Sequence, residues 1–477
     1  LFLSLSFSIL CKKKTEKKPM NFPAIAHESN VVSINVGGRI FQTTKQTLTQ
    51  AGTDSLFSRL ATESTRFVDR DPDLFSVLLY ILRTGNLPAR SREFDVRDLI
   101  EESKHYGIES FLIDSLSNSS QFEAFDLRKS RLLPLNGRDS PSTIAPTANG
   151  GGLHVAHGSK ITSFDWSLRR KSTVLTSFSA VDSLLEISPG VLAAGATDFP
   201  GLQIIDLEND GFVRTTLNWE NRPRSSSSTV QAIGSSSEFL FTSFESSRRN
   251  SNSIMVYDLS TLLPVSEIDH CEIYGSADID SAIPSTKLRW IQSCNLLMVS
   301  GSHSSPSGVN GHVRFWDVRS RNMVWEMKEK QDCFSDVTVS DNLSAVFKVG
   351  VTSGEVFYTD LRSLGCKDHE WVCLGEDEKK RSLNERKGVG CKIESYGNHV
   401  FCSKGSGIEL WSEVITGLVG NASRDVSEER VFRKNTLGES GEKKVTGLVF
   451  GGNRMFVSRK DQQCIEVWQS PSRGVSI

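Results

Sequence analysis

The sequence predicts an α+β domain followed by a large all-β domain built from seven repeated units. Within residues 30–117, two β-branched runs around Gly37-Gly38 precede several stretches with helical spacing. From about residue 126 onward, short apolar strands alternate with polar turns and recur seven times. The chain of 477 residues is also too long for one compact core, so at least two domains are expected.

Composition excludes several classes of protein. Lys plus Arg total 55 and Asp plus Glu total 57, and the resulting net charge of −2 argues against a dedicated binder of nucleic acid or of an anionic membrane. No apolar run reaches the roughly 18–20 residues that a membrane span requires, so no membrane partner is expected. The nine cysteines include no CxxC pair. Reduced thiols, and therefore a cytoplasmic or nuclear location, are expected.

The N-terminal segment does not fit the rest of the pattern. The chain begins with Leu1, and its first methionine is Met20. The apolar stretch 1–10 precedes three lysines at 12–14, which is the reverse of the order in a secretory signal. We expect residues 1–29 to be a disordered or artefactual extension.

The α+β domain begins with a predicted hairpin. The β-branched runs 31–36 and 39–44 predict antiparallel strands, because the two glycines between them permit a tight turn. Helical spacing follows at Leu48, Leu56, Phe57 and Leu60. The stretch 66–72 then predicts a short strand that runs into a turn.

Two further helices complete this domain. Pro72 at the first turn predicts the start of one helix, with Asp71 as its N-cap, and Thr84-Gly85 ends it. Apolar residues share one face of this helix at Leu74, Phe75, Leu78, Leu79 and Leu82. A last helix is ended by Gly107 and carries Val96, Leu99, Ile100, Ser103 and Tyr106.

Taken in order, these pieces resemble the BTB/POZ fold of the potassium-channel tetramerisation (KCTD-like) type. The resemblance rests on residues 35–38, 67–72, 75, 81–85 and 101–108. It implies a domain that self-assembles into four or five subunits and that, in many members, binds the type-3 cullin scaffold of ubiquitin ligases. Some channel versions hold an interfacial zinc ion through His and clustered Cys. No cysteine lies between Ala51 and Ser120, so no metal site is expected.

Three aromatic residues at or near helix ends are the candidates for cullin contact, namely Phe57, Tyr80 and Tyr106. Core packing is the alternative for each of them. The charged segment 69–71 has two interpretations as well. It is either a partner contact or only a turn with a helix cap and a solvated ion pair.

The repeats align on an aromatic-Asp pair or its equivalent. The aligned positions are 165, 206, 258, 317, 360, 412 and 469, and successive positions lie 41–59 residues apart. Each aligned strand follows another short apolar strand, a third strand precedes that one, and a fourth follows in six of the seven units. This arithmetic predicts a seven-bladed β-propeller of four-stranded blades.

The units resemble degenerate WD repeats. Trp316-Asp317 is the single Trp-Asp pair, and no Gly-His dipeptide precedes a first strand. The seventh unit lacks a fourth strand in sequence, whereas the strand-like segment 126–135 is unassigned. We predict that this segment supplies the missing strand and closes the ring, because an open blade edge would leave backbone groups unpaired. The propeller then spans 126–477, after a linker at 118–125.

No enzyme motif is present, and we predict no catalytic, cofactor-binding or metal-binding residues. GxSxG, HExxH and P-loop patterns are absent. His154 and His157 form an HxxH without a third ligand nearby, so structural roles are favoured. Solvation, rather than catalysis, is favoured for Asp278 and Asp280. Two further cysteines, Cys366 and Cys373, flank a loop and fit plain strand positions.

The candidates for target capture combine arginines with one aromatic residue. Trp219, Arg222 and Arg224 fall in a predicted loop between blades, and Arg248 and Arg249 in a loop between second and third strands. In WD-type blades these two kinds of loop share one face. Arginine binds carboxylate and phosphate groups in a bidentate manner, so these residues suit an acidic or phosphorylated peptide. The alternative is that they keep Ser-rich loops soluble, which is our interpretation of the cluster at 169–171.

From about Met20 onward, the chain resembles plant BTB/POZ proteins of the tetramerisation type that carry a WD-like propeller and are regarded as adaptors of type-3-cullin ubiquitin ligases. The resemblance implies a non-catalytic adaptor that forms a homo-oligomer, binds a cullin-3-type scaffold through the BTB domain and recruits an unknown protein target through the propeller. An oligomeric scaffold without a ligase is the alternative. A channel-associated subunit is a third hypothesis, opposed by the missing membrane segment.

Overall fold

The structure is a computed structural model of the chain. It describes residues 30–62, 67–116, 122–148, 150–219, 227–272, 283–305, 308–329, 332–363, 371–375, 387–414, 430–437 and 443–469. The expected extension 1–29 and residues 118–121 of the expected linker lie outside the described residues. The chain folds as two compact units, Leu1–Pro72 and Asp73–Ile477, so the division falls inside the predicted α+β domain.

The first unit contains a three-stranded sheet in the order β2-β1-β3. Strand β1 (Val31–Val36) pairs antiparallel with β2 (Arg39–Thr44), which confirms the predicted hairpin, and β3 (Phe67–Val68) pairs parallel with β1. Gly37 has a positive φ of 52°, and a Cβ there would lie 2.5 Å from the carbonyl oxygen of Arg70. Only glycine fits this turn. Helices α1 (Lys45–Thr49) and α2 (Leu56–Thr62) complete the described part of the unit.

The helices of the second unit are α3 (Pro72–Thr84), α4 (Val96–Tyr106) and α5 (Glu109–Leu116), with a 3-10 helix η1 (Ala89–Glu93) after α3. Helix α3 begins at Pro72, as its position predicts. Asp95 caps α4 by accepting a hydrogen bond from the backbone N–H of Arg97 at 2.8 Å. Gly107 ends α4 in the left-handed conformation, as expected from the sequence. Helix α5 was not predicted.

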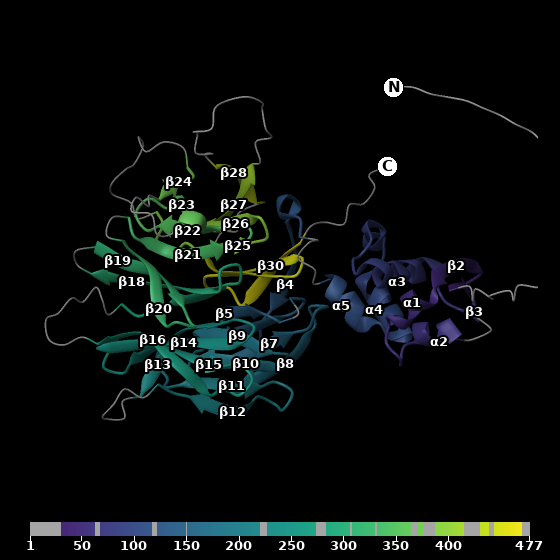
Figure 1. Cartoon of the computed structure of the whole chain (residues 1–477), viewed down its shortest axis with the longest axis horizontal. Helices are drawn as coiled ribbons and strands as arrows, with labels where there is room; N and C mark the ends of the chain where they lie inside the picture. Colours follow the sequence, from purple (N-terminus) through teal and green to yellow (C-terminus); the bar gives the residue numbers. More distant parts are fainter. Residues whose placement is uncertain are drawn as a thin grey trace, which may run out of the picture. The chain divides into compact units, whose positions relative to one another are not determined.

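The second unit also contains seven four-stranded sheets among its described residues (Figure 1). These sheets fit the propeller blades that the sequence predicts. The first sheet contains β5 (Pro141–Pro146), β6 (Leu153–His157), β7 (Lys160–Phe164) and β8 (Arg170–Leu175). The second contains β9 (Ser183–Ser188), β10 (Val191–Gly195), β11 (Leu202–Asp206) and β12 (Phe212–Leu217). The third contains β13 (Ser228–Ser235), β14 (Phe239–Ser246), β15 (Ser251–Asp258) and β16 (Pro264–Glu272).

The fourth sheet contains β17 (Lys287–Ile291), β18 (Leu296–Ser305), β19 (Gly308–Asp317) and β20 (Asn322–Glu329). The fifth contains β21 (Phe334–Ser340), β22 (Ala345–Gly350), β23 (Val356–Asp360) and β24 (Val372–Cys373). The sixth contains β25 (Ile393–Tyr396), β26 (His399–Lys404), β27 (Gly407–Val414) and β28 (Val431–Leu437). The last sheet has the order β29-β30-β31-β4 and contains β29 (Val445–Gly451), β30 (Arg454–Arg459), β31 (Cys464–Gln469) and β4 (Arg128–Pro134). A short 3-10 helix, η5 (Leu361–Ser363), follows β23.

The first strands of the sheets lie next to one another in sequence order. Strand β5 contacts β9, β9 contacts β13, and the series continues through β17, β21 and β25 to β29. Strand β29 in turn contacts β5. The contacts between first strands therefore form a continuous series that returns to β5.

Strand β4 joins the last sheet from the other end of the chain. It pairs antiparallel with β31, as the sequence predicts for 126–135, with Leu133 opposite Ile465. Leu133 and Leu135 are buried in a cluster with Phe456 and Val467. Strand β4 therefore covers the edge that β31 would otherwise expose.

The second half of the predicted linker is packed rather than free. Phe122 and Ala124 contact a buried cluster that includes Phe401 and Phe450. The ring of Phe122 meets those two rings edge-on at centroid distances of 5.9 and 5.7 Å. A 3-10 helix, η3 (Ala124–Asp126), follows. The linker prediction over 118–125 therefore needs correction, because the β-rich domain begins by Phe122.

The aspartates that reveal the sequence repeat are turn caps. The Oδ1 atom of Asp206 accepts hydrogen bonds from the backbone N–H groups of Glu208 and Asn209 at 2.9 and 3.3 Å. The same cap holds the turns after Asp258, Asp317 and Asp360, and Asp165 accepts a backbone N–H from Arg169, four residues later. Hydrogen bonds from Arg214 and Asn209 lower the pKa of Asp206 to about 2. These carboxylates therefore stabilise the turn between third and fourth strands.

In the two remaining sheets the aligned position is not an aspartate. Ser412 lies inside β27, and Gln469 ends β31. Within the described ranges, no helix is long and apolar enough to cross a membrane.

Candidate functional site

The first strands line a polar cavity of about 380 Å³. Several of its lining residues lie at or just before the start of a first strand, so the cavity lies toward the end of the sheets where these strands begin. Hydroxyl groups come from three of these strands, at Ser142, Thr143, Ser335 and Thr446. Charged side chains come from Asp182, Lys287, Asp336, Lys392 and Glu394.

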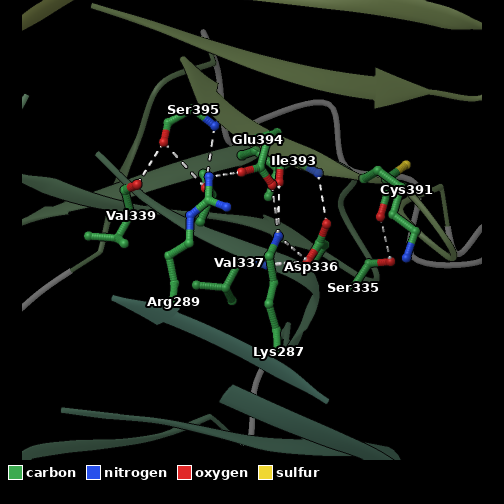
Figure 2. A network of polar contacts seen from close by, with 12 residues as sticks. Lys287, Arg289, Ser335, Asp336, Val337, Val339, Cys391, Ile393, Glu394 and Ser395 are labelled. Carbon is green, nitrogen blue, oxygen red and sulfur yellow. Dashed lines mark hydrogen bonds and ion pairs between the residues drawn. The ribbon is translucent and has the colours of Figure 1, made fainter. Parts of the chain in front are cut away.

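A network of ion pairs ties three first strands together beside this cavity (Figure 2). The Nζ atom of Lys287 on β17 lies 3.0 Å from Oδ1 of Asp336 on β21 and 3.2 Å from Oε2 of Glu394 on β25. Arg289 on β17 pairs with the other oxygen of Glu394. The backbone also takes part, because the N–H of Ile393 donates to Oδ2 of Asp336 at 3.0 Å.

Charge is balanced within this network. Burial lowers the pKa of Lys287, but the carboxylates of Asp336 and Glu394 outweigh that effect, and the net shift is upward. The Lys287 side chain is 23% exposed, and the two carboxylate side chains are 13% exposed. Such partly buried pairs contribute more than surface pairs, since water screens them less. We assign the network to holding neighbouring sheets in place.

Two charged groups of the cavity lie outside the network. Asp182 accepts hydrogen bonds from the backbone N–H and the hydroxyl group of Thr197 at 3.0 and 2.7 Å. Lys392 has no carboxylate partner within ion-pair distance among the described residues. These two side chains are the ones that the cavity leaves available for a bound group.

The candidate Trp219 does not lie on the surface. Its side chain is 4% exposed and packs with Leu217 and Tyr257. The indole N–H donates to Oε1 of Glu267 at 3.0 Å, and the ring meets His270 edge-on. The prediction that Trp219 captures a target is therefore wrong, because a buried ring cannot contact a partner. Leu217 and Trp219 are two residues apart at the end of β12, and side chains at this spacing share one face of an extended chain. This spacing was the sequence signal that Trp219 is buried together with Leu217.

The arginine candidates have different outcomes. Arg222 and Arg224 lie outside the described residues. Arg248 and Arg249 are exposed in the turn between β14 and β15, and Arg249 has a positive φ of 53°. This turn follows Ser246, which pairs with Ser228, the first residue of β13. The turn therefore lies at the end of its sheet where the first strand begins, as the cavity lining does.

Two of the three cullin-contact candidates are buried. Phe57 and Tyr106 are 0% exposed, so their prediction as contact residues is wrong. Phe57 lies three residues before Leu60 on the buried face of α2, and the ring of Tyr106 packs edge-on against Phe75 at 5.3 Å. Tyr80 on α3 is 39% exposed and stays a candidate.

The histidines and cysteines have structural surroundings. Nδ1 of His154 lies 2.8 Å from Oγ of Ser163, and Nε2 of His157 lies 2.9 Å from Oγ1 of Thr162. No group of three potential metal ligands occurs in the part of the chain that the structure describes. Asp278, Asp280 and Cys366 fall outside that part, and Cys373 ends the short strand β24.

Comparison with known proteins decides the family. Residues 137–470 match the family described as At2g24240-like, C-terminal beta propeller, and residues 32–116 match the BTB/POZ domain. The chain belongs to the At2g24240-like propeller family. The predicted BTB/POZ domain and C-terminal β-propeller are thereby confirmed.

Three relatives illustrate how far the similarity extends. The BTB/POZ domain-containing protein At5g41330 of Arabidopsis thaliana is 88% identical over 462 residues, which cover 96% of this chain and 100% of that protein. At4g30940 of the same organism is 31% identical over 470 residues, or 92% of this chain and 97% of that protein. Human KCTD3 is 39% identical over 98 residues, or 18% of this chain and 12% of that protein.

Proposed function

We propose that this protein is a non-catalytic, substrate-recruiting adaptor of a cullin-3-type E3 ubiquitin ligase. Its BTB domain forms a homo-oligomer of four or five subunits and binds the cullin, while its propeller captures a protein target. The observation that carries the proposal is the union, in one chain, of a KCTD-like BTB/POZ domain with a β-propeller. Oligomerisation presents several propellers at once, so a weak affinity for the target becomes a useful avidity.

Exposed apolar side chains on the small sheet support assembly through the BTB domain. Val31, Ile40 and Phe67 are 55%, 68% and 61% exposed. All three lie on the sheet β2-β1-β3. Large apolar side chains exposed together are typical of surfaces that another protein covers.

We infer that the seven sheets are the blades of one closed, WD-like ring. The cyclic contacts from β5 to β29 and back to β5 support this inference, as does the pairing of β4 with β31. A closed ring has no unpaired blade edge and holds its loops in fixed positions. Such a platform suits the capture of a protein target.

An oligomeric scaffold without ligase association is the second candidate. The burial of Phe57 and Tyr106 favours it, because only Tyr80 of the three proposed cullin contacts is left on the surface. We propose a cytoplasmic or nuclear location for either function. The cysteines of the described segments are free thiols, which supports a reducing compartment.

Association with the cullin tests the proposal. The full chain, mixed with the N-terminal region of a type-3 cullin, is expected to co-elute with it from a sizing column. Tyr80→Ala should weaken the complex, whereas Phe125→Ala, which removes an aromatic side chain 60% exposed outside the BTB/POZ match, should not. Absence of a complex with the unmodified chain would reject the ligase function and leave the scaffold.

A further inference from the structure

Five lysines gather around the starts of β25 and β29. They are Lys387, Lys392, Lys443, Lys444 and Lys460, which we call the lysine rim. Contacts tie their segments together. The Lys444 ammonium group donates to the carbonyl oxygen of Val389, and the backbone N–H of Lys460 donates to the carbonyl oxygen of Lys444 at 2.9 Å. Lys387, Lys443 and Lys460 are exposed, and the other two are half-buried.

The charges of the rim are not neutralised by carboxylates. Over the described segments, none of the five ammonium groups has a carboxylate oxygen within 4.0 Å, and Lys443 donates only to the backbone carbonyl of Asp461. Other lysines nearby in the propeller are paired, since Lys404 lies 3.0 Å from Glu355 and Lys434 lies 2.6 Å from Glu409. The rim therefore differs from the ordinary mixed-charge surface of this protein.

A buried arginine below the rim holds the backbone of one rim lysine in place. Arg459 is 1% exposed, and its Nη1 atom donates to the carbonyl oxygens of Ser406 and Lys443, both at 2.7 Å. Its Nε atom lies 3.0 Å from Glu466, which neutralises it. The guanidinium group thus fixes the backbone that carries Lys443 without cancelling the charge of the surface above.

The rim reaches the central cavity. Lys392 lines that cavity together with the hydroxyl-bearing side chains of Ser335 and Thr446. The ion pairs of Lys287 and Arg289 already satisfy Asp336 and Glu394. Among the described residues that line the cavity, Lys392 is therefore the cation left to bind an incoming group. The Ser335 hydroxyl already donates to the carbonyl oxygen of Cys391 at 3.1 Å, so the ammonium group of Lys392 is the donor suited to a carboxylate or phosphate oxygen.

Like charges without carboxylate partners repel one another within a Debye length, which is about 8 Å at physiological ionic strength. An anionic partner removes that repulsion when it binds. A net charge of −2 for the whole chain and the small size of the cavity favour a protein segment over a nucleic acid, which requires a long basic surface. The chemistry shared by acidic and phosphorylated side chains fits the rim.

We propose that the lysine rim, with Lys392 at the cavity, binds an anionic segment of the protein target. This inference rests on the proposed role of the propeller in target capture. Carboxylate or phosphoserine side chains lie over Lys387, Lys443 and Lys460, and one anionic side chain enters the cavity at Lys392.

Fluorescence anisotropy with the full chain tests the inference. The probes are four short labelled peptides of one length and backbone sequence, rich respectively in glutamate, phosphoserine, serine and lysine. Binding of the glutamate or phosphoserine peptide, and of neither other peptide, is expected, and the ratio of the two affinities identifies the source of the anion. Binding should weaken as salt is added.

Two variants, each with three basic residues changed to glutamate, compare the rim with another basic surface. K387E/K443E/K460E changes three exposed rim lysines and should weaken binding of the anionic peptide about tenfold or more. R169E/R170E/K171E changes three exposed basic residues at and just before the start of β8 and should leave binding of the anionic peptide nearly unchanged. K387Q/K460Q is the milder form should the reversal disturb folding, and Lys392→Ala should weaken binding by itself.

Several results would overturn the inference. These are equal binding of serine and glutamate peptides, equal losses in the two triple variants, or tighter rim-dependent binding of single-stranded DNA than of any peptide. Cullin co-elution of K387E/K443E/K460E is measured in parallel and should be unchanged. If the anionic peptides do not bind, only the proposed role of the lysine rim is rejected. If the unmodified chain does not associate with the cullin, the proposed ligase function is rejected.

Discussion

Leu133 on β4 provides a sharp test of how the propeller is held together. Its side chain is 2% exposed and packs against Phe456, Ile465 and Val467 of the last sheet. Leu133→Ala removes this packing and leaves a cavity, which costs about 2–5 kcal/mol in buried sites. The adjacent residue Leu132 is 49% exposed. Leu132→Ala is therefore the matched control, and its cost should stay within about 0.5–1 kcal/mol.

Tryptophan fluorescence in urea measures the two variants in the full chain. All eight tryptophans lie at position 166 or later, so the signal reports on the propeller and not on the BTB domain. With a slope of about 3 kcal/mol per molar urea, Leu133→Ala should lower the midpoint by about 1 M. Equal midpoints for the two alanine variants would refute the account of β4.

A truncation tests the same strand more severely. A chain starting at Ser140 lacks Phe122 and the buried Leu127, Leu133 and Leu135, whereas one starting at Gln121 keeps all four. Burial of three leucines stabilises by about 5–9 kcal/mol, which is comparable with the total stability of a typical domain. The shorter chain should be insoluble or melt at a much lower temperature. Equal melting temperatures would refute the closing role of β4.

Three further predictions concern other parts of the molecule. Phe57→Ala should destabilise the BTB domain by about 3–5 kcal/mol in thermal unfolding followed by circular dichroism, whereas Tyr80→Ala should leave its melting temperature nearly unchanged; the reverse order would contradict the assignment of Phe57 to the core. Lys287→Met removes the cation that Asp336 and Glu394 share and should cost the propeller about 1–3 kcal/mol in urea; an unchanged midpoint would argue against the role of the network. Asp206 has its pKa lowered to about 2 in the folded chain, so its stabilising contribution is present above about pH 4 and is lost between pH 4 and 2. Asp206→Asn should therefore flatten the acid dependence of stability in that window, and an identical acid profile would contradict the turn-cap assignment.

Local patterns were sufficient to predict much of the fold. The hairpin around Gly37 and Gly38, the start of α3 at Pro72 and the end of α4 at Gly107 depend on turn and cap chemistry that is visible in the sequence. Strand β4 was predictable because one blade edge was unfilled and one strand-like segment was unassigned. Helix α5 was missed because it starts only two residues after Gly107, where the sequence indicated an end rather than a new beginning.

The candidate site was harder to predict. Whether an aromatic side chain near a helix or strand end is buried depends on what lies opposite it, and the sequence does not show that partner. Trp219 was therefore misplaced on the surface, although its indole contacts Glu267 on a different strand. The ion pairs of Lys287 join strands that are far apart in sequence, and only the arrangement of the sheets brings Asp336 and Glu394 to it.

The most direct test of the central claim is the mass of the full chain, alone and with a type-3 cullin N-terminal region, by light scattering after size exclusion. The adaptor function predicts four or five times the monomer mass for the chain alone, and a larger complex with one cullin fragment per chain when the two are mixed. A chain that stays monomeric at micromolar concentration and elutes apart from the cullin fragment would contradict it.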